Sequence, residues 1–251
     1  MEHKPLILCS LLLLLASCQH YVSYTDAIVL NDHATFYAAE GRGKPVILLH
    51  GNGGSHCDLE TLQRQVAQAG YLVYALDSRG QGANQPLSEY HYADMAEDVY
   101  AFLEAKGIQQ PAVYGWSDGG IVALELESRH PGTCALIVTS GANVTADNAL
   151  APDVSANIFG DMSDIDSLPP LLRMMCLEPN MTADDLQKIQ VPVLVCAGEH
   201  DLILPEHTAF IAESLPRGEQ RIVPGEGHGS YIWHNPLMGD ILLQYLQKNK
   251  Y

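Results

Sequence analysis

The pentapeptide Gly-Trp-Ser-Asp-Gly at residues 115–119 constrains this chain more than any other segment. An apolar run, 112–114, precedes it and a stretch suited to a helix, 121–126, follows it, so the pattern predicts a strand, a sharp turn and a helix. Such a turn forces the central Ser117 into a strained backbone conformation, and the glycines let the chain double back without a Cβ clash. We therefore expect the Ser117 hydroxyl to be exposed at the end of a strand, as a nucleophile.

A serine hydroxyl is a poor nucleophile unless a histidine takes its proton and an acid orients that histidine. The apolar stretch 193–197 predicts a strand that ends shortly before Asp201, which we interpret as the acid. Glu199 is its rival, but it lies one step inside the strand end. His228 follows in a glycine-rich loop and is the predicted base. The order Ser117, Asp201, His228 is the one expected for serine hydrolases on a doubly wound sheet, so these residues are predicted to form a catalytic triad.

A second glycine-rich turn supplies candidate donors for the negative oxygen that develops in such a reaction. The apolar stretch 46–49 indicates a buried parallel strand, and it leads into His-Gly-Asn-Gly-Gly at residues 50–54. The backbone N–H groups of Asn52 and Asp118 are predicted to form the oxyanion hole. His50 is expected to shape the turn by hydrogen bonding and not to act as a base.

With these motifs in place, the chain from about Ala27 to its end resembles the α/β-hydrolase family. The resemblance extends to the turn at 77–82 and to Arg-His-Pro at 129–131, whereas residues 83–86 depart from the family pattern without affecting a catalytic residue. It implies an α/β-hydrolase fold, with a doubly wound, mostly parallel sheet and a short lid insertion. The sequence Gly-Trp-Ser-Asp-Gly-Gly is similar to that of the branch containing valacyclovir hydrolase and biphenyl hydrolase-related enzymes.

The resemblance also predicts a lid over the active site at about residues 142–187. This segment shows no strand pattern and lies after a predicted strand, 135–139, where the family carries its insertion. Several apolar side chains in the segment either line an adaptable pocket or pack the lid onto the body of the protein. They are Met162, Met174, Met175, Met181, Leu171 and Leu172.

Trp116 and the side chain of Asp118 are the predicted substrate-binding residues. A carboxylate in a site shielded from water would favour substrates with a cation near the scissile carbonyl, such as amino-acid esters. The alternative for Asp118 is a structural role at the positive N-terminal end of the helix that follows it.

The N-terminal residues predict a secretory signal with a lipid-attachment site. Lys4 precedes an apolar run, 6–16, which is too short for a membrane span of about 20 residues. Leu-Ala-Ser-Cys at residues 15–18 resembles the cleavage site of bacterial lipoproteins. We therefore predict a signal peptide over 1–17 and a hydrolase domain over 18–251. An ordinary secretory cleavage site that happens to contain a cysteine is the alternative.

Cys18 is predicted to carry the lipid and to attach the protein to a bacterial cell envelope. Gln19 is not the aspartate associated with retention in the inner membrane, which favours the outer membrane. The formal net charge of −17 is unchanged by cleavage, because the signal contains one acid, Glu2, and one base, Lys4. This charge would repel nucleic acid and anionic membranes, so attachment is expected to depend on the lipid.

No cofactor or metal is expected, because His-Glu-x-x-His is absent and Gly-x-Gly-x-x-Gly does not follow a strand pattern. Besides Cys18, four cysteines follow the signal, and they allow three full disulfide pairings between which the sequence does not choose. They are Cys57, Cys134, Cys176 and Cys196. Cys196 is expected to be a buried packing residue, and Asp77 is expected to stabilise a turn.

These features together predict a serine hydrolase that cleaves a small or medium carboxylic ester through an acyl-enzyme. A lactone, an amide or aminoacyl compound, or a carbon–carbon bond is the alternative substrate for the same triad. A non-catalytic binding protein that kept the fold is the alternative from another class. The oligomeric state stays open.

Overall fold

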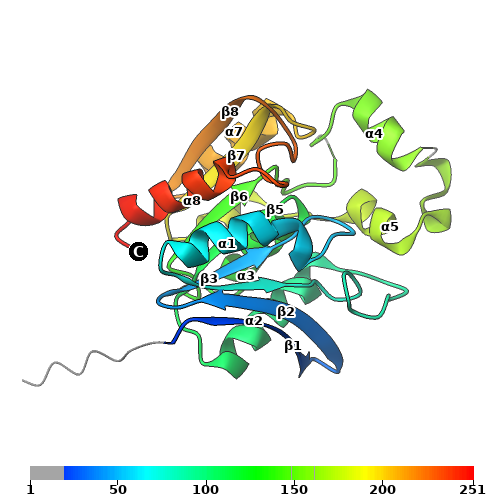
Figure 1. Ribbon diagram of the computed structural model, residues 1–251. Helices are drawn as coiled ribbons and strands as arrows, with labels where there is room; N and C mark the ends of the chain where they lie inside the picture. Colours follow the sequence, from blue (N-terminus) through cyan, green and yellow to red (C-terminus); the bar gives the residue numbers. More distant parts are fainter. Residues whose placement is uncertain (1–19, 148, 161) are drawn as a thin grey trace, which may run out of the picture.

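The computed structural model describes residues 20–147, 149–160 and 162–251, which form one sheet with helices on both of its faces (Figure 1). The predicted signal peptide and Cys18 lie outside these residues. Within the described ranges, no helix is long and apolar enough to cross a membrane.

The sheet contains eight strands in the order β1-β2-β4-β3-β5-β6-β7-β8. Strands β3 to β8 are all parallel, and β2 is antiparallel to both of its neighbours. This arrangement confirms the predicted doubly wound, mostly parallel sheet. The strands are Val22–Leu30 (β1), His33–Gly41 (β2), Pro45–Leu49 (β3), Leu72–Leu76 (β4), Ala112–Trp116 (β5), Leu136–Ser140 (β6), Val193–His200 (β7) and Gly218–Gly227 (β8).

Two hydrophobic cores lie on opposite faces of the sheet. In β3, Val46 and Leu48 belong to one core, and Ile47 and Leu49 belong to the other. Successive side chains of a strand point to opposite faces, so a strand covered on both faces is apolar throughout, as the sequence of β3 is. One face is covered by α1 (Glu60–Gln68), which follows η1 (His56–Leu59), and by α8 (Leu237–Lys248); the other is covered by α2 (Tyr92–Lys106), α3 (Asp118–Arg129) and α7 (Pro205–Ser214).

The polar residues of interest follow the ends of parallel strands. Strands β3, β5 and β7 end immediately before His50, Ser117 and Asp201, and β8 ends at Gly227, immediately before His228. Because the carboxyl ends of parallel strands meet at one edge of a sheet, these four loops converge there.

The predicted lid segment is helical. Between β6 and β7 the chain forms α4 (Pro152–Phe159), η2 (Met162–Ser167), α5 (Pro170–Leu177) and α6 (Ala183–Gln187). Helices α4 and α5 project beyond the end of the sheet in Figure 1. Glu178, directly after α5, ties this segment to the body: its carboxylate lies 2.6 Å from His91 Nδ1 and accepts a hydrogen bond from the Tyr92 N–H at 3.1 Å.

The apolar side chains of the lid divide between the two roles left open by the sequence. Met174 and Met181 are buried in the core and Leu171 packs against it. Leu172 and Met175, in contrast, line a cavity next to Ser117. The Met162 side chain lies outside the described part of the structure.

Candidate active site

The backbone of Ser117 has the strained conformation that its sequence predicts. Its φ is +52°, in a region that side-chain-bearing residues rarely adopt. A Cβ on Gly115 would lie 2.1 Å from the Gly119 carbonyl oxygen, and a Cβ on Gly119 would lie 2.2 Å from that of Leu49. Both positions therefore require glycine. The Ser117 N–H donates to the Ser140 carbonyl at 2.7 Å, which fixes the turn to the neighbouring strand.

Ser117, His228 and Asp201 form one hydrogen-bonded chain. His228 Nε2 lies 3.1 Å from Ser117 Oγ, and His228 Nδ1 lies 2.6 Å from Asp201 Oδ1. Because a carboxylate only accepts hydrogen bonds, Nδ1 carries the proton in the neutral ring and Nε2 is free to accept the serine proton. The structure thus brings together the three residues that the chain order predicts.

The Asp201 carboxylate is held ionised despite its burial. Its side chain is only 1% exposed, and it accepts hydrogen bonds from the N–H groups of Gly198 at 3.0 Å and Ile203 at 3.1 Å. Burial by itself raises the pKa of Asp201, but the hydrogen bond and charge of His228, together with these two N–H groups, lower it below its ordinary value. The acid therefore stays charged beside the imidazole.

Two further side chains position the His228 loop. Trp116 Nε1 donates to the His228 carbonyl oxygen at 3.0 Å. Glu199, the rival acid, accepts a hydrogen bond from the Gly225 N–H at 2.7 Å and makes none with His228. Glu199 therefore supports the loop, whereas Asp201 orients the ring.

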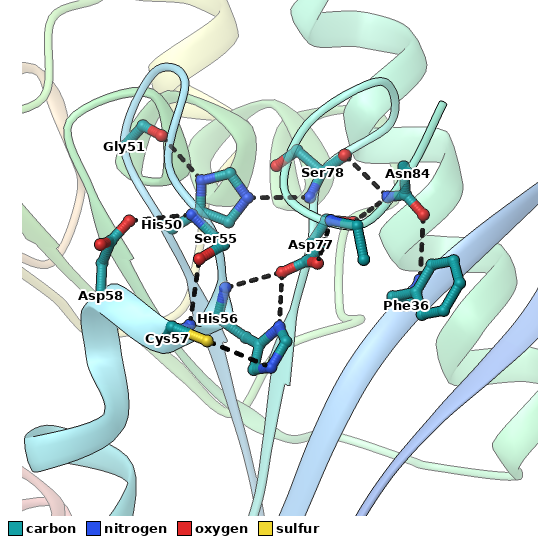
Figure 2. Close-up of polar contacts among 11 residues, drawn as sticks. Phe36, His50, Gly51, Ser55, His56, Cys57, Asp58, Asp77, Ser78 and Asn84 are labelled. Atoms are coloured by element: carbon teal, nitrogen blue, oxygen red, sulfur yellow. Dashed lines mark hydrogen bonds and ion pairs between the residues drawn. The ribbon is translucent and has the colours of Figure 1, made fainter. Parts of the chain in front are cut away.

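His50 shapes the turn at 50–54, as expected. Its Nδ1 lies 2.7 Å from the Gly51 carbonyl oxygen, and its Nε2 accepts a hydrogen bond from the Ser78 N–H at 2.9 Å (Figure 2). Burial lowers the pKa of His50, which favours the neutral ring that this pair of hydrogen bonds requires. A neutral ring with both nitrogens occupied is a structural element and not a base.

Two backbone donors next to Ser117 have no hydrogen-bond partner in the part of the chain that the structure describes. Neither the Asn52 N–H nor the Asp118 N–H donates a hydrogen bond to any group in the described residues. Gly51 packs directly on the serine, since a Cβ there would lie 3.4 Å from Ser117 Cβ. The Gly53 N–H donates to Gln81 Oε1 at 2.7 Å, which holds the turn in place.

Two cavities meet at Ser117 and His228. The larger has a volume of about 440 Å³ and lies between the turn at 50–54 and the lid. The smaller, of about 50 Å³, is more enclosed and lies beneath the lid. Both are bordered by Ile158 and Met175. The larger is also lined by Trp116, Leu172, Trp233 and Asp58, and the smaller by Tyr92, Leu150, Phe159 and Ile203.

The Asp118 carboxyl lines neither cavity. It is 4% exposed and accepts a hydrogen bond from Asn52 Nδ2 at 2.9 Å. Burial raises the pKa of Asp118, and its contacts with Asn52 and Tyr92 oppose this effect. Asp118 stands in the first turn of α3, at the positive end of that helix, as its alternative structural role requires. The carboxyl holds the Asn52 side chain in the turn at 50–54, and its recognition of a cationic substrate group stays a prediction.

Sequence reasoning missed Gln81, Tyr92, Ile158 and Trp233, all of which support or line this site. Gln81 stands in a turn that the family resemblance already marked, which was the one available signal. The other three approach Ser117 from separate elements, and only tertiary packing brings them there. Within the described residues, no group of three or more histidine, cysteine or acidic side chains is arranged to hold a metal.

Comparisons with known proteins agree with this architecture. The family model described as alpha/beta hydrolase fold matches residues 44–165. The AB hydrolase superfamily protein YisY of Bacillus subtilis is 24% identical, with 87% of this chain and 97% of the relative covered. Serine hydrolase BPHL of Homo sapiens is 25% identical, with 84% and 82% covered.

A thermophilic esterase from Thermogutta terrifontis has the same fold, with a TM-score of 0.72 at 18% identity, over 92% of this chain and 99% of the esterase. The serine hydrolase CarC, involved in carbazole degradation, gives a TM-score of 0.75 at 20% identity, over 90% and 100% of the two chains. The predicted fold is thereby confirmed. The chain therefore has the α/β-hydrolase fold.

Proposed function

We propose that this protein is a serine esterase that cleaves small or medium carboxylic esters through an acyl-enzyme. The observation that carries the proposal is the hydrogen-bonded chain from Asp201 through His228 to Ser117, next to two unpartnered backbone N–H groups. A nucleophile, a base with the correct tautomer, a charged acid and oxyanion donors are the parts that acyl transfer needs.

In the proposed first step, Ser117 Oγ attacks the ester carbonyl and His228 Nε2 takes the hydroxyl proton across their 3.1 Å contact. The N–H groups of Asn52 and Asp118 stabilise the oxyanion of the tetrahedral intermediate. Asp201 stabilises the imidazolium. The intermediate collapses, His228 gives its proton to the departing alkoxide, and the acyl group stays on Ser117.

In the second step, His228 takes a proton from water, and the resulting nucleophile attacks the acyl-enzyme at the same carbonyl. Collapse of the second intermediate releases the carboxylic acid and returns the proton to Ser117. The same five groups, which are Ser117, His228, Asp201 and the N–H groups of Asn52 and Asp118, act in both halves of the proposed cycle.

The two cavities support a limit on substrate size. The enclosed cavity of about 50 Å³ has room for roughly three to five water-sized groups, whereas the cavity of about 440 Å³ is open and much larger. Since both meet at Ser117, one substituent of the scissile carbonyl must be short and the other can be long. The walls of both cavities are mainly apolar, which favours uncharged substituents.

A grid of esters tests the proposal, with the acyl chain and the alcohol chain lengthened independently. Lactones, α-amino esters and amides are assayed at the same concentrations, and the Ser117→Ala variant provides the blank. We expect kcat/KM to fall steeply along one axis beyond about four heavy atoms and to change little along the other. Turnover of lactones, amides or carbon–carbon substrates without turnover of esters would replace the proposed activity by one of its alternatives.

We further propose that Cys18 carries a lipid and that the protein is attached to a bacterial envelope, on the support of Leu-Ala-Ser-Cys at 15–18. Two acyl chains at about 0.8 kcal/mol per buried CH₂ suffice for stable anchoring. The wild type should incorporate labelled palmitate and partition into detergent, and Cys18→Ala should do neither. An intact mass with an unmodified N-terminal cysteine in the native host would refute the attachment.

A further inference from the structure

A second acid–imidazole pair, Asp77 and His56, lies at the end of β4 (Figure 2). The Asp77 carboxylate is fully buried, and its Oδ1 lies 2.7 Å from His56 Nδ1. It also accepts hydrogen bonds from the His56 N–H at 2.6 Å and the Ala83 N–H at 2.9 Å. The imidazole of His56 is therefore fixed at both its backbone and its ring.

The other nitrogen of this ring faces a thiol. His56 Nε2 lies 3.6 Å from Cys57 Sγ, as Figure 2 shows. Because the Asp77 carboxylate only accepts hydrogen bonds, Nδ1 carries the ring proton and the Nε2 lone pair is left for the S–H group. The hydrogen bond to Asp77 raises the pKa of His56, which makes Nε2 a better proton acceptor.

Cys57 differs from the other described cysteines in its surroundings. All four are free thiols. Cys134 and Cys196 are buried, as expected for Cys196, and burial raises the pKa of the half-buried Cys176. Cys57 alone among the four is both exposed and in contact with an imidazole.

The structural role of Asp77 does not account for the thiol. Asp77 stabilises its turn through the backbone N–H groups of His56 and Ala83 and through His56 Nδ1. None of these contacts uses Nε2 or Sγ. An acid that fixes the tautomer, a base with a free lone pair and an accessible nucleophile together make a proton relay.

We propose that Cys57 is a second nucleophile of this protein, activated by His56 and oxidised by small uncharged hydroperoxides. The thiol proton passes to His56 Nε2, and the sulfur attacks the terminal oxygen of the hydroperoxide. An S–O bond forms and the O–O bond breaks, so the sulfur is oxidised by two electrons to a sulfenic acid and the peroxide is reduced. The leaving alkoxide or hydroxide takes the proton from His56 and departs as an alcohol or water.

The charge around the thiol favours an uncharged reagent. Cys57 and His56 border an open groove of about 680 Å³ whose other charged residues are Glu40, Glu60 and Arg64. Glu60 pairs with Arg64, whereas Glu40 accepts a hydrogen bond from the Tyr21 hydroxyl at 2.9 Å and has no cationic partner among the described residues. Asp58 and Asp77 lie close to the imidazole as well. This excess of negative charge repels anionic oxidants and alkylating agents.

The proposal is tested on the purified full-length protein with hydrogen peroxide, dimedone to trap the sulfenic acid, and peptide mapping to identify each cysteine. His56→Asn is the matched variant, because the asparagine amide retains a donor near the Nδ1 position and removes Nε2. We expect Cys57 to react at pH 7 at least about tenfold faster than N-acetylcysteine, and His56→Asn to lose that advantage. Cys176 should react at the same rate in both proteins.

Two further readouts keep the test decisive if His56→Asn does not fold. The wild-type rate at Cys57 should follow the titration of an imidazole between pH 5 and 8, where N-acetylcysteine follows only its thiol. Neutral iodoacetamide should alkylate Cys57 faster than anionic iodoacetate, by a larger factor than for N-acetylcysteine. A Cys57 rate equal to that of N-acetylcysteine across this pH range, or an unchanged rate in folded His56→Asn, would overturn the proposal.

Discussion

Two acid–histidine pairs lie at the same edge of the sheet and differ in what surrounds the free imidazole nitrogen. In one, Asp201 fixes His228, whose Nε2 faces Ser117, beside two backbone N–H groups that lack partners among the described residues. In the other, Asp77 fixes His56, whose Nε2 faces the exposed thiol of Cys57 in an open groove.

A proton relay by itself is insufficient for acyl transfer. A serine needs its base and also stabilisation of the oxyanion, which often supplies the largest part of the rate enhancement. A thiol is nucleophilic once its proton is removed, and its attack on a hydroperoxide forms no tetrahedral intermediate, because the leaving oxygen takes its proton from His56. We therefore propose ester hydrolysis for one relay and thiol oxidation for the other, and we expect that each can be removed without the other.

The largest expected effect is the loss of ester hydrolysis without any change in the oxidation of Cys57. Ser117→Ala and His228→Ala should each lower kcat for ester hydrolysis by about 10⁴-fold or more, and the double variant should be little worse than either, because the residues act as a unit. Oxidation of Cys57 should keep its wild-type rate in all three proteins. Near-normal hydrolysis by folded Ser117→Ala would remove the assigned mechanism.

The second-largest effect on kcat is expected for Asp201, the acid that orients His228. Asp201→Asn should lower kcat by about 10³- to 10⁴-fold, because an amide does not hold the proton on Nδ1 or stabilise the imidazolium. Glu199→Gln is the matched control, since Glu199 bonds the backbone of the same loop, and it should stay within about tenfold of the wild type. The opposite ranking of these two variants would make Glu199 the acid.

Asp118→Asn should lower kcat/KM moderately and by the same factor for all esters. The Asp118 carboxyl holds the Asn52 side chain and lines neither cavity, so its loss should weaken the oxyanion turn by about two- to tenfold in kcat/KM. An α-amino ester and its des-amino counterpart should lose equally. A loss confined to the α-amino ester would restore the direct recognition of charge that the sequence suggested.

The buried carboxyls of Asp201 and Asp118 should affect the pH dependence of folding stability in opposite directions. The pKa of Asp201 is lowered in the folded protein, so its contribution is present above about pH 3.9 and is lost as the pH falls below that value. The pKa of Asp118 is raised, so the wild type loses stability as the pH rises above about 3.9.

Urea unfolding between pH 3 and 6 measures both effects. The wild-type free energy of unfolding minus that of Asp201→Asn should rise with pH, and the same difference for Asp118→Asn should fall, each by at most about 1.4 kcal/mol per pH unit. Slopes of the same sign for the two variants would contradict the different surroundings assigned to these carboxyls.

The smallest expected effect belongs to the second relay. Cys57→Ser should change ester hydrolysis by less than about twofold, because Cys57 is exposed and lines neither cavity at Ser117. Oxidation at this position should disappear. A large loss of hydrolysis in Cys57→Ser would mean that the two relays are coupled and do not act as independent sites.

The sequence predicted the parts of this molecule that depend on local chemistry. The glycines at 115 and 119 mark a turn that no other residue fits, and the order of Ser117, Asp201 and His228 follows from which strands end before them. The buried strands are apolar throughout, so their positions were also readable.

The remaining features depend on contacts across the fold. Tyr92 reaches Asp118 from the start of α2, and Trp116 bonds the His228 carbonyl across more than a hundred residues. Neither contact leaves a pattern in the local sequence. His56 and Cys57 are adjacent in the chain, but only the placement of Asp77 by β4 turns them into a relay.

Labelling with a fluorophosphonate tests whether Ser117 is the nucleophile that His228 activates. The reagent is titrated against the wild type while residual ester hydrolysis is measured, and the adduct is located by peptide mapping. We predict one adduct per chain, on Ser117, with activity lost in proportion to labelling, and no adduct in Ser117→Ala. Full hydrolytic activity in protein labelled at Ser117, or loss of activity with the adduct on another residue, would contradict it.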